Sequence, residues 1–284
     1  MQESTSTKFQ GEANLRKMCA ELDSQGRVQY QFTSADILEK NSKLPMNAWI
    51  GLHIRLEYTG TIHCTISGSR IRKTYGDGMG FKAFSESPLG VESILRPEMS
   101  RIHEGVALRD YDWEMAHHMQ PHVTYLSFTS GIKVGVTRAT QLPVRWIDQG
   151  ASAAIILCRT PYRGLAGEIE VDLKSEFSDR TQWRKMLTSG AGDQHPEGLL
   201  EAKEQAIEVL NPAFENFIDE DHTVTQFAYP HEKWPEKVTS CRLDKQPVFE
   251  GRLAAIKGQY LILESGSVLN VRNHAGYRVR WSVG

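Results

Sequence analysis

Two short runs in the middle of the chain constrain its fold more than any other feature. HVTYLSF at residues 122–128 and IKVGVT at residues 132–137 are rich in β-branched and aromatic side chains, which favour strands. Ser130-Gly131 separates the two runs. This dipeptide and the many β-branched residues argue against a single buried helix that spans both runs. The pattern therefore predicts two short strands, with Gly135 inside the second.

The residues that follow predict one more strand and two helices. A short amphipathic stretch begins at Arg145, and AAIILCR at residues 153–159 predicts a third strand. From Gly164 to Leu187 the pattern is helical, because apolar residues recur at four-residue spacing. These residues are Leu165, Ile169, Leu173 and Phe177. The middle of the chain is thus predicted to run β-β-α-β-α.

The N-terminal part of the chain predicts antiparallel sheet followed by loops. RVQYQFT at residues 27–33 alternates between polar and apolar side chains. WIGLHIRLEYTGTIHCTI at residues 49–66 predicts two strands around a turn at Thr59-Gly60. From Tyr75 to Pro121 the chain is rich in Gly, Ser and Pro and its periodicity is weak, so we expect mainly loops.

The C-terminal part predicts a helix and then sheet again. The helix extends from about Glu197 to Leu210, where Asn211-Pro212 stops it, and four strand-like runs follow from Pro247 onwards. The expected fold class is α+β, with a small sheet and its helices flanked by antiparallel β regions. The expected segments are an N-terminal β region (1–120), a core (121–190), a linker with a helix (191–245) and a C-terminal β module (246–284).

Composition argues against several classes of protein. The 284 residues carry a formal net charge of −2, so any contact with nucleic acid must come from a local basic patch. The four cysteines form no C-x-x-C pair, which argues against a disulfide framework and fits a reducing compartment. The start is polar, unlike a signal peptide, and no apolar run approaches the roughly 18 residues of a membrane helix. We expect a cytoplasmic protein with no membrane partner.

Several positions in the core resemble the motifs of the GIY-YIG nuclease superfamily. Val123-Thr124-Tyr125 stands where that superfamily has GIY, and Lys133-Val134-Gly135 resembles the K-I-G form of the second motif in its phage-type branch. Arg145 falls where the superfamily has a helix-borne arginine. Glu170 begins EVDLKSEF, which is similar to the later E-x-x-L-H-x-x-F helix, with Lys174 at the histidine place. The resemblance implies a GIY-YIG-like core at residues 121–190.

The resemblance implies Mg²⁺-dependent cleavage of a phosphodiester, with Tyr125, Lys133, Arg145 and Glu170 as the catalytic residues. Such cleavage needs an activated water and a cation for the developing charge. Tyr125 would act as base or water positioner, Arg145 would clamp the phosphate, and Glu170 would hold Mg²⁺, which commonly takes one or two carboxylates. Gly135 would let a backbone approach closely.

Each of these residues also has a purely structural interpretation. Tyr125 could be a core aromatic, Arg145 a surface ion-pair partner, and Glu170 with Lys174 an ordinary helix pair at i, i+4 spacing. Because lysines replace the superfamily's tyrosine and histidine, a catalytically silent module that binds nucleic acid or protein is the alternative function. The sequence does not separate DNA from RNA as the partner.

Basic residues outside the catalytic set are candidates for binding nucleic acid. Arg138 and Lys174 lie in the core segment (121–190), and arginines alternate with Tyr and Trp in the C-terminal module. That composition suits a nucleic-acid surface, although alternating charges on the solvent face of a sheet look the same. The C-terminal candidates are Arg272, Arg278 and Arg280.

A broader resemblance covers the chain from about Val28 to its C-terminus. The motifs KVGVTR, RWIDQGA, AGEIEV, DRTQWRKML and IKGQYLI occur in order and look like the uncharacterised bacterial family catalogued as domain of unknown function 2797. This resemblance supplies no established activity. It implies a cysteine-rich segment ahead of the core, with C-x-x-C knuckles that look like metal sites.

In this sequence most of those cysteine places hold other residues. Cys64 remains, and the other places hold small residues, with His118 near the last: Ser67, Gly80, Ala83, Gly90, Ser93, Ser100 and Ala107. Structural zinc requires four nitrogen or sulfur ligands. A site built from Cys64 and nearby histidines is the alternative, but we expect no structural zinc and a region held by packing.

Overall fold

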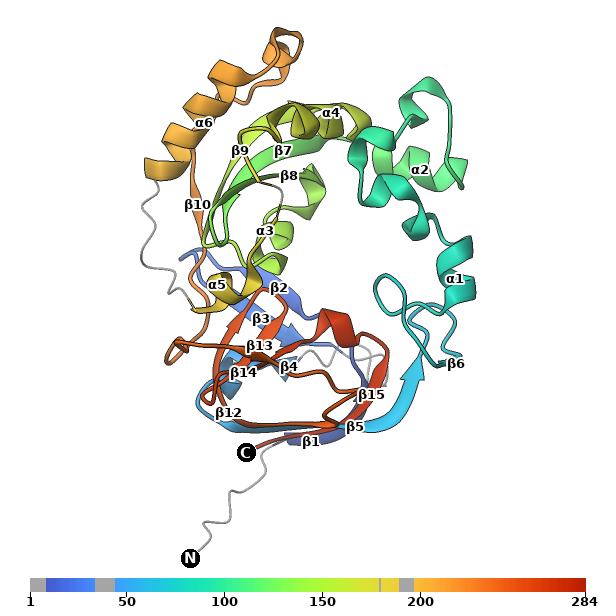
Figure 1. Ribbon diagram of the computed structural model, residues 1–284, viewed down its shortest axis with the longest axis vertical. Coiled ribbons are helices and arrows are strands. Elements are labelled where there is room, and N and C mark those ends of the chain that lie inside the picture. The colour runs from blue at the N-terminus through green and yellow to red at the C-terminus, as the bar shows by residue number, and fades with distance from the viewer. Residues whose placement is uncertain (1–8, 34–43, 179, 189–196) are drawn as a thin grey trace, which may run out of the picture. The chain divides into compact units, whose positions relative to one another are not determined.

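The computed structural model describes residues 9–33, 44–178, 180–188 and 197–284 (Figure 1). The fold class is α+β, as predicted. The chain forms two compact units. One unit comprises Met1–Glu86, Leu187–Ser189 and Tyr229–Gly284, and the other comprises Ser87–Met186 and Gly190–Ala228. Within the described part of the chain, no helix is long and apolar enough to cross a bilayer.

The first unit is built on a sheet that pairs strands from both ends of the chain. Its order is β1-β15-β5-β12-β13-β14-β11, with β6 also paired to β5. The strands are β1 (Phe9–Asn14), β5 (His53–His63), β6 (Arg70–Ile71), β11 (Thr239–Ser240), β12 (Val248–Lys257), β13 (Tyr260–Leu263), β14 (Ser267–Asn270) and β15 (Tyr277–Val283). The N-terminal β region and the C-terminal β module, which were expected as separate segments, therefore share one sheet.

Smaller elements complete this unit. A second, antiparallel sheet has the order β2-β3-β4, and its middle strand is the predicted one at residues 27–33. The elements are β2 (Cys19–Leu22), β3 (Val28–Phe32), β4 (Leu44–Pro45), η1 (Met46–Trp49), α1 (Phe81–Glu86) and η9 (Arg272–His274).

The predicted turn at Thr59-Gly60 is wrong, because β5 continues through it from His53 to His63. Tyr277 of β15 pairs with Ile62 and Val279 pairs with Tyr58, so three residues of β5 face one of β15. Gly60 takes a φ of +84° at this point. A glycine at such an irregularity is typical of a bulge inside a strand, which bends the strand without reversing it.

The second unit contains the predicted β-β-α-β-α order. Its sheet has the order β10-β9-β7-β8, so β8 lies at an edge. The elements are β7 (His122–Phe128), β8 (Ile132–Arg138), η6 (Ala139–Gln141), α3 (Val144–Asp148), β9 (Ala153–Thr160), α4 (Arg163–Leu173), α6 (Glu197–Val209), η8 (Pro212–Phe217) and β10 (Thr225–Gln226). The helix α5 (Trp183–Thr188) begins in this unit, and its last two residues belong to the first unit. The helix predicted up to Leu187 is interrupted after Leu173, because Ser178 pairs with the edge strand and accepts a hydrogen bond from Val134.

The two faces of this sheet are covered by different helices. On one face, Leu126 and Val134 belong to an apolar cluster that includes Ile169 of α4 and Leu199 of α6. On the other face, Tyr125 packs edge-on against Trp146 of α3, with ring centroids 5.8 Å apart. Alternate strand residues point to opposite faces, so one strand supplies both layers.

The segment before β7, predicted as mainly loop, consists of short helices. They are η2 (Pro88–Gly90), η3 (Glu92–Ile94), η4 (Pro97–Met99), η5 (Ile102–Glu104) and α2 (Tyr111–His118). Asp110 caps α2 by accepting a hydrogen bond from the backbone N–H of Trp113. Such a cap is a sequence signal of a helix start, and weak periodicity hid it.

Candidate functional site

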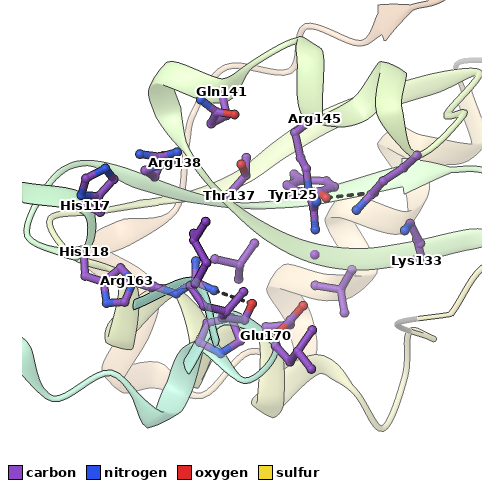
Figure 2. Close-up of a pocket in the computed structure, with 18 of the residues that line it drawn as sticks. His117, His118, Tyr125, Lys133, Thr137, Arg138, Gln141, Arg145, Arg163 and Glu170 are labelled. Carbon is purple, nitrogen blue, oxygen red and sulfur yellow. Dashed lines mark hydrogen bonds between the residues drawn. The ribbon is translucent and has the colours of Figure 1, made fainter. Parts of the chain in front are cut away.

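A pocket of about 360 Å³ lies along β8 (Figure 2). Backbone and side chains of β8 line it, together with residues from α3, α4 and the short helices before β7. All four predicted catalytic residues contribute, namely Tyr125, Lys133, Arg145 and Glu170, and so do Arg138 and Lys174. The structure thus brings together every core residue that the sequence analysis singled out for chemistry or binding.

The pocket concentrates positive charge. Five of its lining side chains are cationic and only Glu170 is acidic, although the chain has a net charge of −2. The cations are Lys133, Arg138, Arg145, Arg163 and Lys174. Charges of one sign in a concave, partly desolvated site raise the local concentration of an oppositely charged ligand. The pocket can therefore attract and hold an anion.

Gly135 accommodates a side chain of its own sheet. It pairs directly with Tyr125 on β7, and a Cβ at Gly135 would lie 2.7 Å from the Tyr125 hydroxyl oxygen. We had expected the glycine to let a backbone approach closely; in the structure the phenol ring of Tyr125 occupies the space above it. The tyrosine and the glycine of the two motifs therefore form one packing unit.

The hydroxyl of Tyr125 is buried and donates a hydrogen bond to Oε1 of Gln149, 3.0 Å away. Burial raises the pKa of Tyr125, and the nearby guanidinium of Arg145 offsets this only in part. The hydroxyl is therefore protonated at neutral pH. Of the two roles considered for Tyr125, this geometry favours positioning over proton abstraction.

Gln149 and Arg163 line the pocket and were missed from sequence. Gln149 follows Arg145 by four residues, so the two share a helix face. Arg163 is the first residue of α4, where the helix dipole disfavours a cation. A cation at such a position indicates a functional or structural role, and this was the sequence signal that could have identified Arg163. Burial lowers the pKa of Arg163 to about 10, helped by the charge of Arg145, so Arg163 stays protonated at neutral pH.

Arg163 also fixes the segment before β7. Its guanidinium donates to the carbonyl oxygen of Ser93 through Nε (3.0 Å) and Nη2 (2.8 Å), and to that of Ile94 through Nη2 (3.0 Å). Gly164 and Gly167 allow close packing, because a Cβ there would lie 2.5 Å from the Ser100 oxygen and 2.2 Å from the Glu98 nitrogen respectively. One face of α4 therefore anchors this segment beside the pocket.

Glu170 is the only acidic side chain among the described residues that line the pocket. Its side chain is 11% exposed, and Nζ of Lys174 lies 3.7 Å from Oε2. The i, i+4 pair that we considered as an alternative is thus present, but on a pocket wall instead of a solvated face. Among the described residues, no group of three or more His, Cys, Asp or Glu side chains could hold a metal ion. The donor set fits only an ion such as Mg²⁺, which accepts one carboxylate and takes its remaining oxygens from water and phosphate.

The three C-terminal arginines lie in the other unit and pair with carboxylates. Arg272 makes a bidentate contact with Asp77, Nε–Oδ1 at 2.7 Å and Nη2–Oδ2 at 2.9 Å. Arg278 pairs with Glu12, and Arg280 pairs with Glu57. Because each positive charge has a negative partner, this geometry favours ordinary surface ion pairs over a phosphate-binding face.

Residues at several of the former cysteine places remain in contact through other atoms. Oγ of Ser100 lies 3.0 Å from Nδ1 of His118, and both side chains are buried. In the other unit, Cys64 Sγ accepts N–H groups from Ser67 and Gly80. Burial acts to raise the pKa of this thiol, but the N–H donors outweigh it and lower the pKa to about 7. Our expectation of no structural zinc stays a prediction, which elemental analysis of the purified protein checks.

Comparison with known protein families gives a match to most of the chain. The sequence model of a family described as protein of unknown function (DUF2797) matches residues 51–279, which include every residue that lines the pocket. No curated protein and no solved structure matches the chain.

Proposed function

The chain belongs to the DUF2797 family, and we propose that the pocket along β8 binds the phosphate groups of a nucleic acid and hydrolyses a phosphodiester with the help of Mg²⁺. One observation supports this most directly: five cations converge on one pocket in a chain of negative net charge. Phosphate contacts supply most of the affinity in non-specific nucleic-acid binding, so such a patch suits this ligand.

The arrangement of the second unit supports a GIY-YIG-like core. Its elements follow the order β7-β8-α3-β9-α4, and the residues at the motif positions line one pocket. In this proposal the Arg145 guanidinium donates two parallel hydrogen bonds to the phosphate, for which its planar fork is suited. Lys133, which is 6% exposed on β8, adds a charge in a partly desolvated position.

Tyr125 and Glu170 would orient the reacting groups. Gln149 holds the Tyr125 hydroxyl in one direction, so the phenol can position a neighbouring oxygen. Glu170 would hold Mg²⁺, and the bound ion would act as a Lewis acid on the phosphoryl oxygens. Figure 2 shows Glu170 apart from Arg138 and Arg145, and in this proposal the phosphate would lie between them.

A catalytically silent binding module is the second candidate. The observation that favours this module is the position of Lys174, whose ammonium lies 3.7 Å from the carboxylate of Glu170. The ammonium balances part of the negative charge of Glu170 that a metal ion would otherwise balance. In this case the pocket would bind phosphate without cleaving it.

A cleavage assay separates the two candidates. Wild type, Glu170→Gln and the control Glu168→Gln, an exposed position on the same helix, are incubated with a panel of DNA and RNA in Mg²⁺ or Mn²⁺. Cleavage by wild type and Glu168→Gln, with loss in Glu170→Gln, supports hydrolysis. Binding to the same panel is measured by fluorescence anisotropy. If wild type binds the panel but cuts nothing, the silent module is correct; if wild type binds nothing, both candidates fail.

A further inference from the structure

The pocket has a second wall that the proposed phosphate chemistry does not use. Beside the cationic side chains, the short helices before β7 contribute apolar and aromatic groups. The apolar wall consists of Leu89, Ile94, Leu95, Pro97, Trp113 and His117. A site for inorganic phosphate alone would gain nothing from such a surface, because phosphate offers no apolar group to cover it.

The apolar wall is held in place by α4. Arg163 donates three hydrogen bonds to the carbonyls of Ser93 and Ile94, immediately before Leu95. Gly164 and Gly167 let the next residues pack directly on the helix. The wall is therefore attached to the same helix that carries Glu170.

Part of this wall is exposed and therefore available to a ligand. Leu95 is 87% exposed and Leu89 is 43% exposed, at the rim of a strongly charged pocket. The Trp113 ring stacks on His117 at a centroid distance of 4.0 Å and an angle of 9°. Figure 2 shows His117 beside Arg138, so the aromatic pair lies next to a cation. An aromatic stack beside cations matches a ligand that carries a flat ring and an anionic group together.

We infer that the pocket accepts a single unpaired nucleotide, with its base against the apolar wall and its phosphate on Arg138 and Arg145. This inference rests on the proposed function and names the form of nucleic acid that the site recognises. Bases stack on aromatic and apolar side chains through their faces, and single-strand binding proteins combine such stacking with a basic groove.

A double helix does not offer the same contact. Its base faces are covered by neighbouring pairs, and a nucleotide must be unpaired or rotated out of the helix before its face is free. The volume of about 360 Å³ is near the lower end of the range for small-molecule sites, which suits one nucleotide unit. The ligand is therefore a single strand, a strand end or an extruded nucleotide, of DNA or RNA.

Fluorescence anisotropy in EDTA tests the inference, because binding is then measured without cleavage. The probes are labelled 12-nucleotide oligomers of one mixed sequence: single-stranded DNA, single-stranded RNA, the DNA duplex, and a base-free strand of abasic units. We expect wild type to bind one or both single strands at least tenfold more tightly than the duplex and the base-free strand. The ratio between the DNA and RNA strands identifies the preferred sugar.

Variants of the apolar wall give the decisive comparison. Trp113→Ala should weaken single-strand binding about tenfold and Leu95→Ala about threefold, with base-free binding unchanged in both. Leu108→Ala, in the same segment but outside the pocket, is the control. Leu95 is so exposed that its variant keeps the fold, so the test holds even if Trp113→Ala unfolds.

The outcomes separate this inference from the proposed function. If wild type binds all four probes equally, or both wall variants retain full single-strand affinity, the nucleotide inference is overturned and phosphate binding stands. If Arg145→Ala weakens binding of every probe while the wall variants weaken binding of only the single strands that carry bases, both are supported. If wild type binds no probe, both are overturned.

Discussion

The ring of Tyr125 lies over Gly135 on the neighbouring strand, with space for a hydrogen atom but not for a methyl group. A Cβ at Gly135 would come within 2.8 Å of the Tyr125 Cζ atom and 2.7 Å of its hydroxyl oxygen. The glycine thereby sets the position of a hydroxyl that faces Arg145 and Gln149 at the pocket. A residue that carries no side chain thus controls the geometry of the candidate site.

Gly135→Ala should destabilise the protein by about 1–3 kcal/mol, the usual cost of overpacking a well-packed position. The matched control is Gly131→Ala, because a Cβ at Gly131 meets nothing within 4 Å. The free energy of unfolding, measured by urea denaturation, should fall for Gly135→Ala and stay within about 0.5 kcal/mol for the control. In a Tyr125→Leu background the loss of stability caused by Gly135→Ala should be smaller. An unchanged loss would show that the added methyl group does not clash with the Tyr125 ring.

Gly167→Ala should also destabilise, against the normal preference of a helix. Alanine in a helix interior is usually about 1 kcal/mol more favourable than glycine. At Gly167, however, the methyl group would meet backbone atoms of Pro97 and Glu98, which cannot rotate away. We expect a net loss of about 2 kcal/mol, whereas Gly198→Ala on α6, where a Cβ meets nothing within 4 Å, should be neutral or stabilising. Equal effects of the two variants in urea denaturation would contradict the close packing.

The pocket arginines, and not the C-terminal ones, should carry nucleic-acid affinity. Arg138→Ala and Arg145→Ala should each weaken binding and reduce the slope of log K against log salt by about 1, as expected for one lost phosphate contact. Arg145→Lys should resemble Arg145→Ala, because a point charge does not replace the fork. Replacing Arg272, Arg278 and Arg280 together by alanine should leave affinity within about twofold, since each is paired with a carboxylate. A salt titration followed by anisotropy measures both effects, and a flattened slope in the triple variant would reverse this assignment.

The protein should lose stability below neutral pH through two buried histidines. Burial lowers the pKa of His118 to about 3 and that of His122 to about 4, whereas an unfolded chain binds these protons near pH 6.5. Because the pKa of each histidine is lower in the folded protein than in the unfolded chain, its contribution to stability is complete above pH 6.5 and is lost as the pH falls towards 4. Each histidine should therefore cost on the order of 2 kcal/mol between pH 7 and pH 5.

Urea denaturation at the two pH values checks this dependence. His122→Gln should remove about half of the loss in unfolding free energy between pH 7 and pH 5. His222→Gln, at an exposed position in the same unit, should leave that loss unchanged. The comparison uses the difference between pH values, so any constant cost of the substitution cancels. An identical pH dependence in wild type and His122→Gln would contradict the prediction.

Local sequence patterns were sufficient for most individual elements. The β-branched runs at residues 122–128 and 132–137 gave β7 and β8 almost residue for residue, and the proline after Asn211 marked the end of α6 closely. These signals succeed because strand and helix preferences depend on neighbouring side chains and on turn chemistry. Gly60 shows the limit, since the same glycine chemistry serves a turn and a bulge, and the partner strand decides between them.

The sequence by itself determined the order of elements in the second unit and the identity of six side chains that line its pocket. Only the tertiary structure decided that β1 pairs with β15 from the opposite end of the chain, that Gly135 accommodates Tyr125, and that an apolar wall lines the same pocket as the cations. Arg163 illustrates the reason, because its partners Ser93 and Ile94 lie about seventy residues earlier. Periodicity reports contacts within one element, whereas a pocket is made by packing between elements, and the energy of that packing depends on side chains that no local pattern brings together.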